Sequence, residues 1–170
     1  MTDYYDSIAP GYDNLHKEEQ LKKLNEIKDA LGNSLPKKGD LLLDVGCGTG
    51  ISTAFWNCTC TGIDPSEELI KIARENYPDR KFIVSKGEEL PFPNNSFDFV
   101  VSITAIHNFD DVKQGIMELK RVGSDKFVIT AFRKSAKLEE IQKLIIINFK
   151  VNKILMEDKD LIFICEKLQK

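Results

Sequence analysis

Several features that would assign this chain to a specialised class are missing from its sequence. Its apolar runs fall far short of the ~20 residues that a bilayer-spanning helix needs, and its first residues are polar and acidic, unlike a signal peptide. Its 27 acidic residues outnumber the 24 basic ones, whereas binding to nucleic acid phosphates usually requires a basic excess. We therefore expect a cytoplasmic protein without membrane insertion, in which only a local basic patch could attract nucleic acid.

Cysteine and histidine are also scarce. A structural zinc site usually needs two clustered cysteine pairs, or one pair with nearby histidines, and this chain has a single Cys-x-Cys and only two histidines. We therefore predict no metal site, and thiols that are small buried side chains in a reducing compartment. The cysteines are Cys47, Cys58, Cys60 and Cys165.

The chain does contain a regular alternation of short apolar runs and amphipathic segments. The pattern predicts strands at 41–45, 58–63, 80–84, 97–103 and 126–132, and helices at 18–31, 51–57, 111–122 and 136–147, with a further helix capped by Ser66. Such alternation is typical of a doubly wound, Rossmann-like α/β fold: a mostly parallel sheet with helices on both faces.

Two final segments, 148–156 and 160–168, are separated by a short turn and therefore predict an antiparallel hairpin at one sheet edge. The length of 170 residues, without internal repeats or a long linker, fits one domain. We expect residues 1–170 to form it, with an N-terminal cap segment and helix over 1–35 and the core over 40–170.

A glycine-rich loop, Gly46–Gly50, follows the first predicted strand. Its glycines stand at positions 46, 48 and 50, and position 51 is Ile, so the Gly-x-Gly-x-x-Gly spacing of dinucleotide-binding loops is not met. An NAD-linked dehydrogenase is therefore disfavoured. Asp44, at the strand end, is interpreted either as a ligand-site residue or as an acceptor of loop N–H bonds. Asp64 ends the next strand. A carboxylate at this position can accept hydrogen bonds from both hydroxyls of a ribose, or it can simply precede the start of the next helix.

At these residues the chain resembles the class I S-adenosylmethionine (SAM)-dependent methyltransferases, particularly the small-molecule, "type 11" group that includes ubiquinone and menaquinone biosynthesis enzymes. Asp44–Gly50 is similar to the family's cofactor loop, and Gly62–Ser66 to its ribose-binding strand end. Gly87–Phe92 and Ser96–Val100 resemble its third and fourth motifs, and Tyr4–Asp13 resembles an N-terminal segment that often folds over the cofactor. The resemblance implies a seven-stranded sheet whose last strand is antiparallel.

The same resemblance implies SAM as cofactor and S-adenosylhomocysteine (SAH) as product. It places Gly46 and Gly48 against the methionine part, Asp64 on the ribose, and Gly87 and Glu88 beside the adenine. Tyr12 and Ser102 are expected near the methionyl end or the sulfonium. The full set of implied cofactor-binding residues is Tyr12, Asp44, Gly46, Cys47, Gly48, Asp64, Pro65, Gly87, Glu88 and Ser102.

The next candidates concern catalysis and the methyl acceptor. His107, just past the fourth strand, is a candidate general base or a residue that only shapes the pocket. Arg133 and Lys134 follow the fifth strand on the ligand-binding edge, where they attract an anionic acceptor or simply remain solvated. We expect a methyltransferase of the EC 2.1.1 class with a small-molecule acceptor. The alternatives are an RNA or protein methyltransferase with an open site, or a non-catalytic SAM-binding subunit of a partner.

Overall fold

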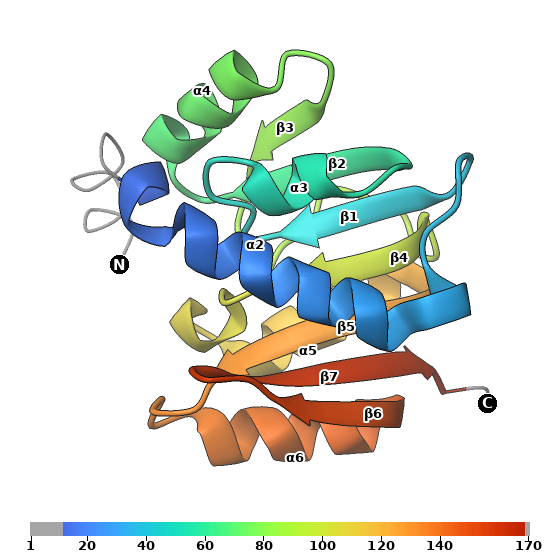
Figure 1. Cartoon of the computed structure of the whole chain (residues 1–170). Helices are drawn as coiled ribbons and strands as arrows, with labels where there is room; N and C mark the ends of the chain where they lie inside the picture. The colour runs from blue at the N-terminus through green and yellow to red at the C-terminus, as the bar shows by residue number, and fades with distance from the viewer. Residues whose placement is uncertain (1–11, 169–170) are drawn as a thin grey trace.

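The computed structural model describes residues 12–168, with side chains described from residue 16 onward. A seven-stranded sheet in the order β3-β2-β1-β4-β5-β7-β6 forms its centre (Figure 1). β1 to β5 pair in parallel, whereas β7 pairs antiparallel with both β5 and β6. The predicted mostly parallel sheet with a closing antiparallel hairpin is therefore confirmed. The strands are β1 (Leu41–Val45), β2 (Thr59–Asp64), β3 (Lys81–Val84), β4 (Phe97–Ser102), β5 (Gly123–Phe132), β6 (Phe149–Met156) and β7 (Asp160–Lys167).

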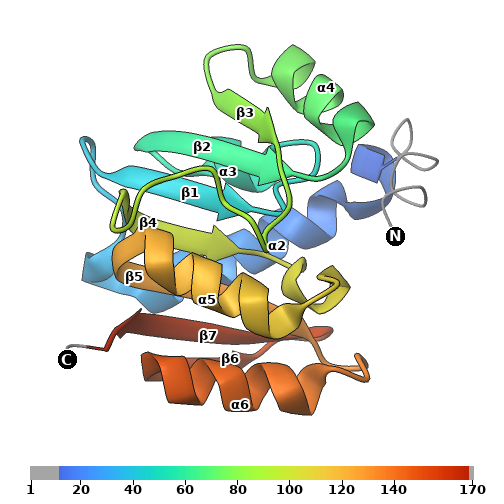
Figure 2. The same ribbon diagram turned by 180° about the vertical axis from the view of Figure 1, so that it is seen from behind.

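Helices cover both faces of the sheet. α2 and α3 lie in front of it in Figure 1, and α5 and α6 lie on the opposite face, which is turned toward the viewer in Figure 2. This confirms the doubly wound arrangement. The helices are α2 (Tyr12–Leu31), α3 (Ile51–Phe55), α4 (Glu67–Asn76), α5 (Val112–Val122) and α6 (Leu138–Asn148), with short 3₁₀ helices η2 (Gly32–Ser34) and η3 (Ile106–Asn108).

The apolar run of β1 explains how the two layers are held together. Successive side chains of a strand point to opposite faces, so Leu42 belongs to the same buried cluster as Leu24 and Ile27 of α2, whereas Leu43 belongs to the cluster that contains Ile116 and Leu119 of α5. All six side chains are buried. A strand that is covered on both sides is expected to be nearly continuously apolar, and in β1 only Asp44 interrupts the apolar run.

Two predicted boundaries differ from the structure by more than two residues. α2 begins at Tyr12 rather than at residue 18, because the residues before 18 lack a regular apolar period that would reveal a helix. β5 begins at Gly123 rather than at residue 126. Its first residues include exposed Ser124 and Asp125, and Gly123 is placed in the strand by pairing with Phe97 of β4 rather than by an apolar pattern.

The cysteines are free thiols, and only Cys58 is partly exposed while Cys47, Cys60 and Cys165 are buried. Cys58 and Cys60 lie with their Sγ atoms 3.4 Å apart. Within the described part of the chain, every helix is too short or too polar to cross a bilayer.

Candidate functional site

A cleft opens at the carboxyl ends of the parallel strands. β1 lies between β2 and β4, so the chain leaves β1 in one direction across the sheet and later returns on its other side. Ligands of open α/β sheets bind at such a reversal point. The empty space within the cleft measures about 810 Å³, a value that includes open solvent. Its lining residues are Gly46, Gly48, Asp64, Pro65, Ser66, Leu69, Lys86, Gly87, Glu88, Ile103, Thr104, Ala105, Asn108, Phe109 and Asp110.

The glycine loop forms the floor of this cleft next to β1. Gly46, Gly48 and Gly50 have φ values of +80°, +54° and +88°, a left-handed region that favours glycine. A Cβ on Gly46 would lie less than 3.0 Å from the Cβ of Ala105, which follows β4. The loop and the segment after β4 are therefore packed backbone against side chain, and both contribute to the cleft wall.

Asp64 is held in a fixed orientation at the end of β2. Its Oδ2 accepts a hydrogen bond from the backbone N–H of Gly48 at 3.0 Å, and its Oδ1 accepts one from the N–H of Ser66 at 2.9 Å. The side chain lines the cleft and is 8% exposed. A carboxylate at this position, at the carboxyl end of the strand next to β1, is where ribose hydroxyls bind in related α/β folds.

Asp44 lies behind the cleft rather than in its wall. It is fully buried, and its Oδ2 accepts hydrogen bonds from the hydroxyls of Ser52 and Thr53 at 2.5 and 2.7 Å. Its Oδ1 is buried without a hydrogen-bond partner among the described residues. Burial raises the pKa of Asp44 to about 6; the two hydroxyls oppose the shift, and the nearby charge of Asp64 adds to it. The hydrogen bond from the loop N–H of Gly48 is accepted by Asp64, whereas Asp44 anchors α3.

We expect the stability contribution of Asp44 to decrease with rising pH. The folded state raises its pKa from 3.8 to about 6, so folding favours the neutral carboxyl. The contribution is full below the unfolded pKa and is lost as the pH rises through the folded pKa. The shift corresponds to about 3 kcal/mol. Urea unfolding of wild type and Asp44→Asn from pH 4.5 to 7.5 measures it. The wild-type advantage should shrink up to about pH 6.5 and then stay constant; a difference independent of pH would contradict the assignment.

Gly87 and Glu88 line the cleft beyond β3, as the resemblance implies. A Cβ on Gly87 would overlap the ring of Phe109, and so would one on Gly115 within α5. Oε1 of Glu88 accepts hydrogen bonds from the backbone N–H groups of Asp110, at 2.7 Å, and of the next residue. The loop after β3 and the start of α5 are thereby joined around one aromatic ring, which sequence reasoning did not single out. Gly115 is the sequence feature that could have indicated this contact. A glycine inside a helix weakens the helix, so its presence there suggests that a neighbouring group packs closely.

The structure brings some predicted residues together and leaves others out of the cleft wall. Pro65 lines the cleft. Cys47 and Ser102 are buried behind it, and the Ser102 hydroxyl has no hydrogen-bond partner among the described residues. Tyr12 belongs to α2, but its side chain lies outside the described residues. Thr104 and Ala105, which sequence reasoning did not select, line the cleft directly after β4.

His107 occupies the 3₁₀ helix η3, but its ring is not part of the cleft wall. The ring lies 5.7 Å from that of Phe132, centroid to centroid, and its Nδ1 is buried without a partner among residues 12–168. Burial lowers the pKa of His107, the charges of Lys23 and Lys137 lower it further, and Asp160 opposes them. The imidazole is therefore held in its neutral form near pH 7.

Several basic side chains between residues 120 and 137, called the basic stretch below, make contacts within the protein. Arg133 donates hydrogen bonds to the carbonyls of Glu157 and Asp158 at 3.3 and 3.1 Å, and Lys137 donates to the carbonyl of Phe109 at 2.5 Å. Lys134 is exposed. Arg133 thus fixes the β6–β7 turn, and neither Arg133 nor Lys134 lines the cleft. Further contacts of the stretch bind Arg121 to Glu118, Leu90 and Phe92 and place Lys126 over the ring of Phe99.

Comparison with known proteins identifies the family. Residues 43–126 match the model of a methyltransferase domain. The chain belongs to the class I SAM-dependent methyltransferases. It is 35% identical over 131 residues to an uncharacterised protein of Methanocaldococcus jannaschii, covering 74% of this chain and 48% of that protein. It is 32% identical over 127 residues to the demethylmenaquinone methyltransferase of Chlorobaculum tepidum, covering 69% and 52%. The chain thus spans about half the length of the curated relatives it matches.

Solved structures share the fold of this chain. The magnesium protoporphyrin IX methyltransferase of Synechocystis, whose structure contains SAM, superposes with a TM-score of 0.73 over 86% of this chain and 79% of that one, at 15% identity. A protein of Pyrococcus horikoshii gives a TM-score of 0.75 over 94% and 96%, at 19% identity. At these identities the likeness establishes the fold alone.

Within residues 12–168, no cluster of three or more histidine, cysteine or acidic side chains could hold a metal ion.

Proposed function

We propose that the chain binds SAM in the cleft and transfers its methyl group to a small-molecule acceptor. The observation that carries the proposal is the Asp64 carboxylate, oriented by the N–H groups of Gly48 and Ser66 in the middle of the cleft. Loops for the two ends of the cofactor flank it. The glycine loop and the segment after β4 lie on one side, and Gly87 and Glu88 lie on the other.

The residues present fit this cofactor. The Asp64 carboxylate lines the cleft at the carboxyl end of β2, the position from which a carboxylate accepts hydrogen bonds from ribose hydroxyls. Gly46 has no room for a side chain because of Ala105, so its backbone can approach an amino-acid tail closely. Gly87 and Phe109 supply an apolar wall on the adenine side. Acidic side chains around the cleft also suit a cofactor that carries a positive sulfonium.

When bound, SAM supplies an activated methyl group for an in-line displacement. The protein holds and orients, which alone contributes on the order of 7–11 kcal/mol to lowering such a barrier. Among its residues, Asp64 would fix the ribose and Ala105 would limit the space at the glycine loop. The role of His107 as a general base stays a prediction. Its lowered pKa keeps the ring neutral and able to accept a proton, but the ring must first reach the cleft.

A small molecule is the acceptor class that the surroundings favour. The demethylmenaquinone methyltransferases and the protoporphyrin methyltransferase are named for small organic acceptors. Arg121, Arg133 and Lys137 make contacts within the protein, which reduces the number of cations in the basic stretch that could bind RNA phosphates.

Two measurements test the proposal in sequence. Titration calorimetry should detect binding of SAH at micromolar to millimolar concentration, with NAD as the control that does not bind. Transfer of labelled methyl from SAM should then appear in a small-molecule extract rather than in RNA or protein fractions. Absence of SAH binding would refute the cofactor assignment. Binding without transfer to any fraction would favour a non-catalytic subunit, and label in RNA or protein would replace the acceptor class.

A further inference from the structure

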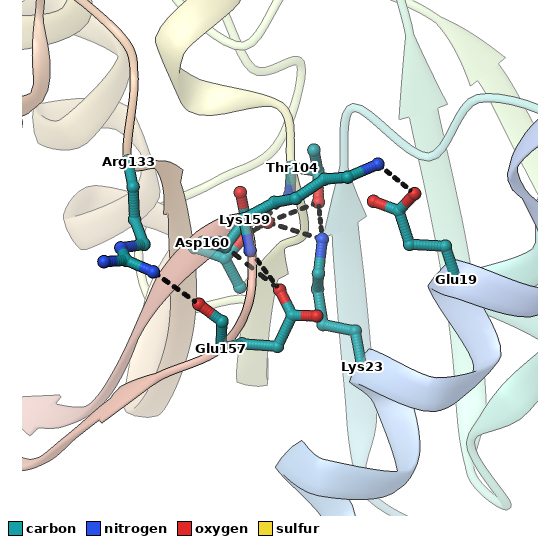
Figure 3. Close-up of polar contacts among 8 residues, drawn as sticks. Glu19, Lys23, Thr104, Arg133, Glu157, Lys159 and Asp160 are labelled. Carbon is teal, nitrogen blue, oxygen red and sulfur yellow. Dashed lines mark hydrogen bonds and ion pairs between the residues drawn. The ribbon is translucent and has the colours of Figure 1, made fainter.

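A buried ion pair links the first helix of the structure to its last strand. Lys23 of α2 and Asp160 of β7 are 1% and 0% exposed, and Lys23 Nζ lies 2.6 Å from Asp160 Oδ2 (Figure 3). Exposed pairs join the same two regions, Lys22 with Asp158 and Lys159 with Glu19. Because removing two charges from water largely offsets their attraction, a fully buried pair is weak as a source of stability. Its value lies in what it holds in place.

The pair holds Thr104, which follows β4. Lys23 Nζ donates a hydrogen bond to Thr104 Oγ1 at 2.7 Å, and Thr104 Oγ1 donates to Asp160 Oδ2 at 2.7 Å (Figure 3). The hydroxyl of Thr130 in β5 donates to Asp160 Oδ2 at 3.1 Å and accepts from the backbone N–H of Thr104 at 2.7 Å. Side chain and backbone of Thr104 are therefore fixed by three different elements of the fold.

Thr104 needs this fixation because its backbone is strained. Its φ is +54°, a conformation that a β-branched residue rarely adopts. Such residues persist only where the surroundings over-determine them, and they cluster at ligand sites. Thr104 lines the cleft between Ile103 and Ala105. The network thus holds a strained residue in the cleft wall.

The position of Thr104 decides which part of a ligand it faces. Asp64 ends β2, and Thr104 follows β4, which lies beyond β1 in the sheet. With a ribose on Asp64 and the adenine beside Gly87, the amino-acid tail points toward β1 and β4. We propose that Lys23 and Asp160 are positioning residues that act through Thr104 to shape the cleft wall at the amino-acid end of SAM. The proposal rests on the proposed function.

Two ligands separate this role from general stability. SAH carries the amino-acid tail, whereas 5′-methylthioadenosine has the same adenosine part and lacks the tail. In Thr104→Val, which removes the hydroxyl at nearly constant volume, calorimetry should show SAH affinity about tenfold lower and methylthioadenosine affinity unchanged. Thr104→Ser, which keeps the hydroxyl, should bind SAH with wild-type affinity. The double variant Lys23→Met/Asp160→Asn leaves no unpaired buried charge and replaces no residue that lines the cleft, and it should show the same selective loss.

Lys22→Met is the matched control, since its exposed pair with Asp158 joins the same helix and turn. It should bind both ligands as the wild type does. Variants that retain wild-type affinity for SAH, or that lose both ligands equally, would overturn the positioning role while leaving the proposed function intact. A wild-type protein that binds neither ligand would overturn both. Fitted affinities are compared at matched stoichiometry, so that a smaller folded fraction is not mistaken for weaker binding.

Discussion

Asp64→Asn is expected to lower the affinity for SAH by about 100-fold. Hydrogen bonds to a charged group contribute about 1.5–3 kcal/mol each, and two ribose hydroxyls would lose the carboxylate as their acceptor. A total loss of about 3 kcal/mol corresponds to roughly two orders of magnitude. Titration calorimetry measures the change. Asp125→Asn is the matched control. Asp125 is exposed near the start of β5, whereas the cleft lies at the carboxyl ends of the parallel strands, so this variant should bind SAH as the wild type does.

The loss must be assigned to the ribose rather than to a disturbed loop, because Asp64 also accepts the N–H bonds of Gly48 and Ser66. Adenosine and 2′,3′-dideoxyadenosine make this distinction. The wild type should prefer adenosine strongly, and Asp64→Asn should bind both weakly and about equally. If the variant keeps the wild-type preference between the two nucleosides, the carboxylate does not hold the ribose.

Gly46→Ala is expected to reduce the free energy of unfolding by about 3–4 kcal/mol. The φ of +80° costs a non-glycine residue about 1–2 kcal/mol, and the new Cβ would meet that of Ala105 at less than 3.0 Å. Overpacking of this kind costs about 1–3 kcal/mol. Urea unfolding measures the sum. Gly32→Ala serves as control: its φ is +52° but no atom lies within 4 Å of its Cβ, so only the backbone cost of about 1 kcal/mol remains.

A second substitution separates the two causes at Gly46. Ala105→Gly removes the atom that the new Cβ would meet, so Gly46→Ala/Ala105→Gly should regain about 2 kcal/mol relative to the sum of the single changes. Additive effects would mean that the loop after β4 can move away, and that the glycine loop and Ala105 do not form one rigid wall.

The sequence was sufficient to predict the layers of the fold and the region of the cleft. Apolar runs such as Leu41–Val45 show the period of buried strands, and the short turn before residue 160 reveals the hairpin. Gly46, Gly48, Asp64 and Gly87 line the cleft as expected, because left-handed glycines and a carboxylate at a strand end are local features that sequence displays directly.

The remaining differences concern contacts between distant segments. Asp44 is adjacent to the cleft in sequence but faces Ser52 and Thr53 of α3, and Arg133 is on the ligand edge but binds the β6–β7 turn. Thr104 gave no local signal at all, since its left-handed backbone is imposed by Lys23, Thr130 and Asp160. Burial and partner choice are set by tertiary packing, which a periodic pattern does not encode.

The link between α2 and β7 also affects the order of folding. Lys23 and Asp160 are separated by 137 positions, and contacts of such separation close large loops and slow the search for the native state. During synthesis the helix emerges long before the hairpin, so Asp160 is not available to Lys23 until β7 has left the ribosome. The wall around Thr104 is therefore completed late, after the parallel strands that carry the glycine loop and Asp64 have been made.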